Sequence, residues 1–257
     1  MTAAASPAEL FALDGRRAVI TGASRGIGAR AAQVLDAAGA SVALVARDEA
    51  RLDEVAATLR NDTIVLPTDL GEPDAGERLA ERIEQRWGGA DILVNNAGLS
   101  RTAPAVEMST TDWDDVLAVN LRSVFTLTRC LAPGMLARGW GRIVTVASAL
   151  GLVGEPYAAP YVASKSGVLG LTRSLAVEWA SSGVTVNALC PGWVDTDMVT
   201  HLREDPRFHR RAMRRIAARR WGVPEDLDGA LLLLVSPASA YLTGQAIVVD
   251  GGLVAGW

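Results

Sequence analysis

The chain has 257 residues, of which 49% are hydrophobic and 21% charged, and its net charge is −4. This is a globular composition, and the acidic balance argues against a nucleic-acid-binding surface. The longest apolar run, residues 230–235, is too short to cross a membrane, and residues 1–9 lack the basic and apolar segments of a secretory signal. We therefore expect a cytoplasmic protein.

Short runs of consecutive apolar, mainly β-branched residues are typical of strands that are buried on both faces. Seven such runs occur, at residues 18–21, 41–46, 63–66, 92–95, 142–147, 184–189 and 246–249. Longer segments with helical spacing separate them, for example 26–38, 72–87 and 161–179. This alternation predicts a single α/β domain over residues 1–257, a doubly wound Rossmann fold with a parallel sheet of about seven strands and helices on both faces. Ligands of such folds bind beyond the carboxyl ends of the strands.

The first predicted strand leads into Thr-Gly-Ala-Ser-Arg-Gly-Ile-Gly, residues 21–28, and a helix follows. Glycines allow a tight turn and a close approach of phosphate to the backbone. The free N–H groups and the positive end of the helix dipole favour an anion there. The spacing G-x-x-x-G-x-G at this position therefore predicts a dinucleotide site, although turns also need glycine for purely structural reasons.

The end of the second predicted strand bears on the choice of dinucleotide. An acidic side chain there would bind the ribose hydroxyls of NAD, but the sequence places Ala46 at this point, followed by Arg47. Arg25 lies in the glycine turn, and two guanidiniums could hold a 2′-phosphate. We therefore predict that NADP(H) is preferred over NAD(H). The alternative is that both arginines are solvated and that Asp48 serves the ribose.

The segment Tyr-Val-Ala-Ser-Lys, residues 161–165, contains the only lysine of the chain, since the other 24 of its 25 basic residues are arginine. On a helix Tyr161 and Lys165 would share a face. A nearby ammonium lowers the pKa of a phenol, and lysine offers a compact cation that suits ribose hydroxyls better than the rigid fork of arginine. The pair therefore predicts that Tyr161 is a general acid whose pKa is lowered by Lys165. The alternative is a solvated lysine that happens to follow a tyrosine.

Ser148 follows the predicted strand 142–147 directly, where ligands bind in this architecture. Its hydroxyl could bind a substrate carbonyl. Without the tyrosine nearby, a serine that caps a turn would be the simpler interpretation.

With these residues in view, the chain resembles the classical short-chain dehydrogenase/reductase (SDR) family, in particular its 3-oxoacyl reductase and ketoreductase members, from about Leu13 to Gly252. The resemblance implies a catalytic tetrad of Asn120, Ser148, Tyr161 and Lys165. It also implies cofactor contacts by residues of the glycine turn, of the segments after the third, fourth and sixth strands, and of the catalytic helix. The predicted cofactor-binding residues are Gly22, Ser24, Arg25, Gly26, Ile27, Gly28, Arg47, Asp69, Leu70, Asn95, Ala97, Gly98, Tyr161, Lys165, Pro191, Gly192, Val194 and Thr196.

The resemblance further implies roles. Tyr161 would give a proton to the carbonyl oxygen as hydride arrives, and Lys165 would lower the tyrosine's pKa and hold the nicotinamide ribose. Ser148 would position the oxygen, while Asn120 would hold a helix distortion and a water that leads protons to Lys165. Asp69 and Leu70 would contact the adenine, and residues 95–98 would stabilise the sheet beside the cofactor. Trp193 is bulkier than this family pattern suggests.

Three functions remain open at this point. The first is an NADPH-dependent reductase of 3-oxoacyl or related ketones, and the second is an NAD(P)-dependent dehydrogenase of a sugar, polyol or other secondary alcohol. A dinucleotide-binding sensor without turnover is the third, against which the complete tetrad argues. Residues 149–160 are apolar except for Glu155 and Tyr157, which suits a small-molecule ketone with apolar flanks better than a free sugar.

The segment 196–220, predicted by the resemblance to be a substrate lid, is rich in arginine. On one continuous helix, its arginines at 203, 207, 210, 211, 214 and 215 would form one face. Such a face could attract an acidic carrier protein, coenzyme A phosphates or a carboxylate. The alternative is a solvent-exposed helix face whose arginines pair with Glu204, Asp205 or a neighbouring subunit. Arg101 is a further candidate anion contact.

The apolar C-terminal segment 246–257 ends in Trp257. Together with the resemblance, it suggests burial at a subunit contact and a homotetramer or dimer, against a tail that folds back on its own subunit. Cys130 and Cys190 match no metal-ligand spacing, and we expect both to be buried thiols in a reducing compartment.

Overall fold

A computed structural model describes residues 6–256. Seven strands form one parallel sheet in the order β3-β2-β1-β4-β5-β6-β7. Their bounds are β1 Arg17–Thr21, β2 Ser41–Ala46, β3 Thr63–Pro67, β4 Ile92–Asn95, β5 Gly141–Val146, β6 Val184–Pro191 and β7 Ala246–Val249. The seven predicted runs match these strands to within two residues at each end. The doubly wound parallel sheet is thereby confirmed.

Ten α-helices and one π-helical turn are formed by the described residues. The α-helices are α1 Pro7–Phe11, α2 Gly26–Ala37, α3 Glu49–Ala56, α4 Ala75–Trp87, α5 Thr110–Leu117, α6 Ser123–Arg138, α7 Ala159–Trp179, α8 Thr200–Glu204, α9 Pro206–Arg215 and α10 Asp228–Val235, and the π-helical turn is η1 Ala118–Arg122. None of the helices within residues 6–256 combines the length and apolar character that a membrane span requires.

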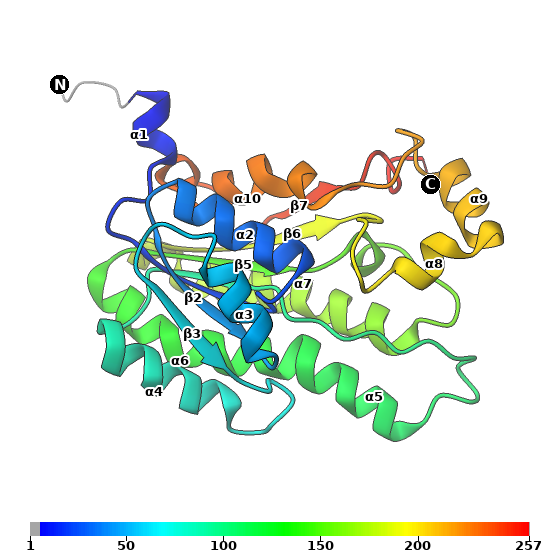
Figure 1. Ribbon diagram of the computed structural model, residues 1–257, viewed down its shortest axis with the longest axis horizontal. Coiled ribbons are helices and arrows are strands. Elements are labelled where there is room, and N and C mark those ends of the chain that lie inside the picture. The colour runs from blue at the N-terminus through cyan, green and yellow to red at the C-terminus, as the bar shows by residue number, and fades with distance from the viewer. Residues whose placement is uncertain (1–5, 257) are drawn as a thin grey trace.

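Each strand contributes alternate side chains to two separate apolar layers, as the two-residue period of a strand requires. On β1, Ala18 and Ile20 pack with α2, α3 and α10, whereas Val19 packs with α4, α6 and α7. Figure 1 shows these two sets of helices on opposite faces of the sheet. The consecutive apolar residues of the strands are therefore explained by burial on both sides.

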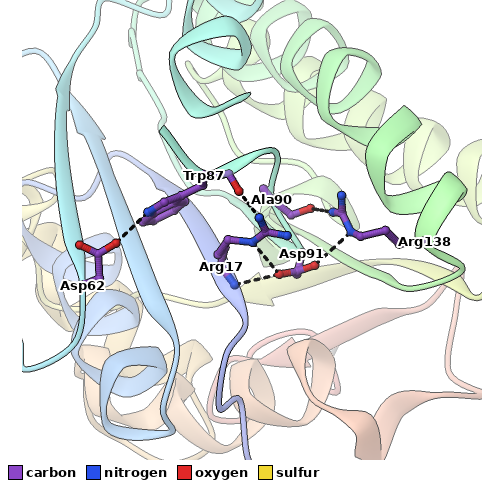
Figure 2. Close-up of polar contacts among 6 residues, drawn as sticks. All are labelled: Arg17, Asp62, Trp87, Ala90, Asp91 and Arg138. Atoms are coloured by element: carbon purple, nitrogen blue, oxygen red, sulfur yellow. Dashed lines mark hydrogen bonds and ion pairs between the residues drawn. The ribbon is translucent and has the colours of Figure 1, made fainter. Parts of the chain in front are cut away.

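The amino-terminal edge of the sheet is held by a buried carboxylate. Asp91 precedes β4, its side chain is only 5% exposed, and its Oδ2 accepts the backbone N–H and the Nε–H of Arg17, at 3.0 and 3.2 Å. Its Oδ1 lies 3.4 Å from Nε of Arg138 at the end of α6. Figure 2 shows Asp91 between the two guanidiniums, which also donate to the carbonyls of Trp87 and Ala90. This network joins β1, β4 and α6 at the edge opposite the carboxyl ends of the strands.

Candidate active site

A cavity of about 1330 Å³ lies at the carboxyl edge of the sheet. One end is lined by the glycine turn after β1 and by the end of β2, and the other by Ser148, Tyr161 and the segment that carries α8 and α9. Its volume exceeds the roughly 300–1,000 Å³ of an ordinary small-molecule pocket. The cavity therefore has room for a large cofactor and a second molecule.

The backbone angles and close contacts of the turn require glycine at several positions. Gly22 and Gly26 have φ angles of +66° and +55°, which favour glycine. A Cβ added to Gly28 would lie 2.1 Å from the Gly22 carbonyl oxygen, so α2 could not begin so close to the turn with any other residue there. The amide of Asn96 donates to the carbonyls of Thr21 and Gly22, at 2.9 and 3.1 Å. Gly26 and Ile27, the first residues of α2, line the cavity, so the turn fits a pyrophosphate.

The two arginines predicted to bind a 2′-phosphate both line the cavity. Arg25 donates to Asp197 at 2.9 Å, and Nη1 of Arg47 lies 3.9 Å from Asp69. The structure adds Arg51, which the sequence analysis missed and which lies 3.6 Å from Asp197. The signal that could have identified Arg51 as a cavity residue is its position shortly after the second strand.

Asp48, which was the alternative partner for an NAD ribose, instead makes contacts within α3. It caps α3, with Oδ1 accepting the backbone N–H of Arg51 at 3.2 Å, and its Oδ2 lies 3.4 Å from Nε of the same arginine. A carboxylate that caps a helix and pairs with a guanidinium is less available to a ribose. This geometry favours the phosphate-binding interpretation of the arginines.

Three members of the predicted tetrad meet at the cavity. Ser148 follows β5, and its Oγ accepts the N–H of Leu150 at 3.1 Å. Tyr161 lies in the first turn of α7, and Lys165 lies one turn later, with Nζ 5.6 Å from the centre of the tyrosine ring. Nζ also donates to the Val146 carbonyl at 2.8 Å. The strand end and the helix start thus place a hydroxyl, a phenol and an amine in one wall.

Burial governs the protonation of this group. It raises the pKa of Tyr161, an effect partly offset by a hydrogen bond with the Ser148 hydroxyl. Burial also lowers the pKa of Lys165 from 10.5 to about 8. The spacing of Tyr161 and Lys165 predicts a lowered phenol pKa, whereas in the protein alone desolvation is the larger effect and the pKa of Tyr161 is raised. The lowered phenol pKa stays a prediction for the cofactor-bound enzyme.

We expect Lys165→Met to stabilise the cofactor-free protein by about 2 kcal/mol at pH 7, because it removes a buried cation. Below pH 8 the lysine is charged in both the folded and the unfolded state, so the full cost of burial is present. Between about pH 8 and 10.5 the folded protein releases its proton first, the unfolded chain binds more protons, and wild-type stability rises. Urea unfolding at pH 7 and pH 10 should show the advantage of the variant shrink. Exposed Arg173→Met, on the same helix, is the control and should show no such change; an advantage independent of pH would contradict the prediction.

Asn120 is buried and does not line the cavity. It lies in the π-helical turn η1, which agrees with the helix distortion expected of it. Its Oδ1 accepts the N–H of Leu99 at 2.7 Å, and its Nδ2 donates to the Leu99 carbonyl and to Oγ of Ser164, at 2.9 and 3.0 Å. Ser164, which the sequence analysis missed, donates to the Tyr161 carbonyl at 2.7 Å. Asn120 thereby ties the loop after β4 to the helix that carries Tyr161.

Most of the predicted cofactor-binding residues line the cavity. These are Gly22, Ser24, Arg25, Gly26, Ile27, Arg47, Asp69, Leu70, Ala97, Gly98, Tyr161, Lys165, Pro191, Gly192, Val194 and Thr196. Gly28 does not line it and instead lets α2 approach the turn. Asn95 does not line it either, because it is buried and its amide donates to Thr128 on α6 at 3.1 Å.

The arginine-rich segment is two helices and not one. Asp205 separates α8 from α9, which begins at Pro206, so Arg203 is not part of the face that the later arginines form. Arg203 pairs with Asp195 instead. Glu204 and Asp205, which the alternative interpretation named as partners within the chain, are not the carboxylates that pair with Arg203, Arg211 and Arg215. Glu155, whose side chain is only 6% exposed, pairs with Arg211 and also with Arg215, at 3.0 Å for the latter.

An aromatic cluster that the sequence analysis missed anchors this segment. The rings of Trp193 and Phe208 lie 5.0 Å apart, and those of Trp193 and Trp221 lie 5.9 Å apart. Leu253 of the C-terminal segment is buried in the same cluster. Trp193 thus packs under α9 and its bulk is accommodated by these partners. Trp257 lies outside the described residues.

Arg101 and the two cysteines do not line the cavity. Arg101 pairs with Asp112 at 3.2 Å. Cys190 is fully buried beside the site, and burial raises the pKa of its thiol to about 11, whereas Cys130 is only half-buried. The expectation of two buried thiols is therefore right for Cys190 alone.

Comparison with known proteins finds relatives along nearly the whole chain. A family model described as enoyl-(acyl carrier protein) reductase matches residues 22–254. Gluconate 5-dehydrogenase of Gluconobacter oxydans is 39% identical over 95% of this chain and 97% of its own length. The 3-oxoacyl-(acyl-carrier-protein) reductase FabG of Vibrio cholerae is 38% identical over 94% of this chain and 98% of its own length.

Solved structures agree with these matches. A crystal structure of a gluconate 5-dehydrogenase from Burkholderia cenocepacia, in complex with NADP and tartrate, is 36% identical and covers 97% of this chain and 99% of its own, with a TM-score of 0.91. A putative NAD(P)-dependent gluconate 5-dehydrogenase from Beutenbergia cavernae, with bound NADP at low occupancy, is 42% identical and covers 96% of this chain and 99% of its own, also with a TM-score of 0.91. The cavity thus belongs to a fold that binds NADP in several related proteins.

Proposed function

The chain belongs to the classical short-chain dehydrogenase/reductase family, and from this premise we propose that it is an NADPH-dependent reductase of 3-oxoacyl or related ketones. The family and the named relatives make it an NAD(P)-dependent oxidoreductase of secondary alcohols and ketones with an NADP-binding Rossmann fold. The observation that carries the proposal is the convergence of Ser148, Tyr161 and Lys165 on one wall of the cavity.

The proposed chemistry uses these residues in distinct ways. A bound nicotinamide supplies or accepts the hydride. Ser148 hydrogen-bonds the carbonyl oxygen of the substrate, and the Tyr161 hydroxyl donates a proton to that oxygen in reduction. Lys165 places a cation beside the phenol and bonds the ribose. The buried pair of Asn120 and Ser164 keeps the first turns of α7 in register with the loop after β4.

A second function is a dehydrogenase of a sugar acid, polyol or other secondary alcohol. The names of the gluconate 5-dehydrogenase relatives, and the complex of one neighbour with NADP and tartrate, favour it. The apolar lining contributed by residues 149–160 favours the ketoreductase. Initial rates with 3-oxoacyl thioesters, simple ketones, gluconate and cyclic alcohols separate the two functions. Turnover of gluconate with none of any ketone or thioester would overturn the first.

We propose NADP(H) as the preferred cofactor. Arg25, Arg47 and Arg51 line the cavity near the end of β2, and Asp48 caps α3. Wild type should bind NADPH at least about tenfold more tightly than NADH, since a bound phosphate gains charge-assisted hydrogen bonds. Arg25→Gln and Arg47→Gln should each weaken NADPH binding by about fivefold to fiftyfold with little change for NADH. Fluorescence titration of reduced cofactor measures both. Arg173→Gln is the control, and equal binding of the two cofactors by wild type would refute the proposal.

We propose that residues 1–257 form one dinucleotide-binding domain. Within it, residues 196–220, with α8 and α9, act as the substrate lid. The buried pairs of Glu155 and the aromatic cluster support a closed arrangement of this segment. A homotetramer or dimer in the cytoplasm remains our prediction. Exposed apolar side chains on α6, α7 and β7, among them Phe125, Val177 and Val248, support a subunit contact.

A further inference from the structure

Five arginines line the cavity, and four of them have carboxylate partners. Arg25 and Arg51 pair with Asp197, Arg47 lies beside Asp69, and Arg211 pairs with Glu155. Arg207 is the fifth, and within residues 6–256 no carboxylate lies within ion-pair distance of its guanidinium. Among the described residues it is therefore the cavity-lining arginine whose guanidinium has no carboxylate partner.

Arg207 belongs to the part of the cavity lining that α9 contributes, whereas Arg25 precedes α2 and Arg47 and Arg51 follow β2. It is the second residue of α9, one helical turn before Arg211, so both side chains project from one face. The other residues that line this part come from the same segment and from the loop that carries Glu155, Pro156 and Tyr157. An anion bound by Arg207 would consequently belong to the substrate and not to the adenosine end of the cofactor.

The position of Arg207 is well defined by its neighbours. The carboxylate of Asp205 accepts its backbone N–H at 2.8 Å and caps α9, and Pro206 begins the helix. Phe208 packs edge-on against Trp193, and the Arg211 guanidinium lies 4.8 Å from the centre of the Phe208 ring. The first turn of α9 is thus anchored on both sides of Arg207, while its own side chain is exposed to the cavity.

The charges that line this part of the cavity balance one another. Glu155 and Asp205 carry a charge of −2 and Arg207 and Arg211 a charge of +2, and Arg215, which does not line the cavity, is a second partner of Glu155. Glu155 alone would repel an acidic substrate from the cavity wall. Its pairing with Arg211 and Arg215 neutralises that repulsion and leaves Arg207 to attract an anion.

We propose that Arg207 binds the carboxylate of an oxo-acid or hydroxy-acid substrate whose carbonyl or hydroxyl carbon lies at Ser148 and Tyr161. This inference rests on the proposed function and narrows its substrate class to small acids. A guanidinium recognises a carboxylate through two parallel hydrogen bonds, which fixes orientation as well as charge. Arg207 would therefore decide which end of a flexible acid faces the nicotinamide. The rival explanation is an exposed arginine face of α9, including Arg210 and Arg214, that attracts an acidic carrier protein.

The test compares acids with their neutral amides. The probes are acetoacetate and acetoacetamide, 4-oxopentanoate and 4-oxopentanamide in the reductive direction, and gluconate and gluconamide in the oxidative direction. Wild type should show a kcat/KM at least about tenfold higher for the acid than for the amide in at least one pair. Arg207→Gln should lower kcat/KM for that acid by about tenfold to a hundredfold and change the amide by less than about threefold. Arg207→Lys should keep part of the preference.

Arg210→Gln is the matched control, because Arg210 is exposed on the same helix and does not line the cavity. It should leave both members of each pair unchanged. Equal losses with Arg207→Gln and Arg210→Gln would overturn the inference in favour of a general charge effect of the helix. Turnover of amides and neutral ketones without any preference for acids would overturn this inference alone. Absence of turnover with every ketone and oxo-acid would overturn the proposed function itself, even if gluconate were oxidised.

Discussion

Replacing Tyr161 by Phe is expected to lower kcat for ketone reduction by about a hundredfold to ten-thousandfold, the usual contribution of a positioned general acid. The phenol lies in the cavity wall, hydrogen-bonded to the Ser148 hydroxyl and one helical turn from Lys165. Phe keeps the ring and its packing but has no proton to donate. Steady-state kinetics with saturating NADPH measure the loss, while the affinity for NADPH should change by less than about fivefold because the glycine turn is untouched.

Tyr241→Phe is the matched control for this prediction. It makes the same chemical change at a tyrosine that is fully exposed and does not line the cavity. The control should retain wild-type kcat. If Tyr161→Phe also reduced ketones at the wild-type rate, Tyr161 would not be the proton donor and the proposed chemistry would fail.

Replacing Asp91 by Ala is expected to destabilise the protein by about 3–5 kcal/mol, because it leaves two partly buried guanidiniums without their shared carboxylate. Asp91 also accepts the backbone N–H of Arg17 at 3.0 Å, so the start of β1 loses a hydrogen-bond partner as well. Asp91 precedes β4, and its partners Arg17 and Arg138 (Figure 2) lie on β1 and α6, so the change affects all three elements. Urea unfolding, followed by far-UV circular dichroism, measures the free energy of unfolding.

Asp62→Ala provides the control within the same region. Asp62 accepts the indole N–H of Trp87 at 2.9 Å and lies 3.5 Å from Arg86, but its side chain is 51% exposed (Figure 2). Exposed ion pairs contribute little, so this variant should lose less than about 1 kcal/mol. Comparable losses for the two variants would show that burial does not set the strength of the Asp91 network.

Much of the site could be predicted because its parts are local. The glycine turn lies within residues 21–28, and Tyr161 and Lys165 lie one helical turn apart. Ser148 follows a strand that consecutive apolar residues identify. In a parallel sheet the carboxyl ends of strands share one edge, so local recognition of each strand was sufficient to bring these residues together.

Other parts depended on contacts between distant segments. The pairing of Glu155 with Arg211 and Arg215 spans 56 and 60 residues, and Pro206 broke the helix on which one arginine face was expected. The direction of the Tyr161 pKa was also wrong for the protein alone, because desolvation depends on every element packed around the phenol. Neither periodicity nor spacing contains this information.

The amino-acid sequence by itself determined the order of strands and helices along the chain, the glycine turn and the side chains that we propose to react. These features follow from hydrophobic period, glycine conformation and side-chain chemistry, all of which act within a few residues. Only the tertiary structure decided which arginines are neutralised, how α9 is anchored by Trp193, and that Arg207 faces the cavity without a carboxylate partner among the described residues. Charge balance and desolvation are sums over neighbours in space, and chain folding sets those neighbours.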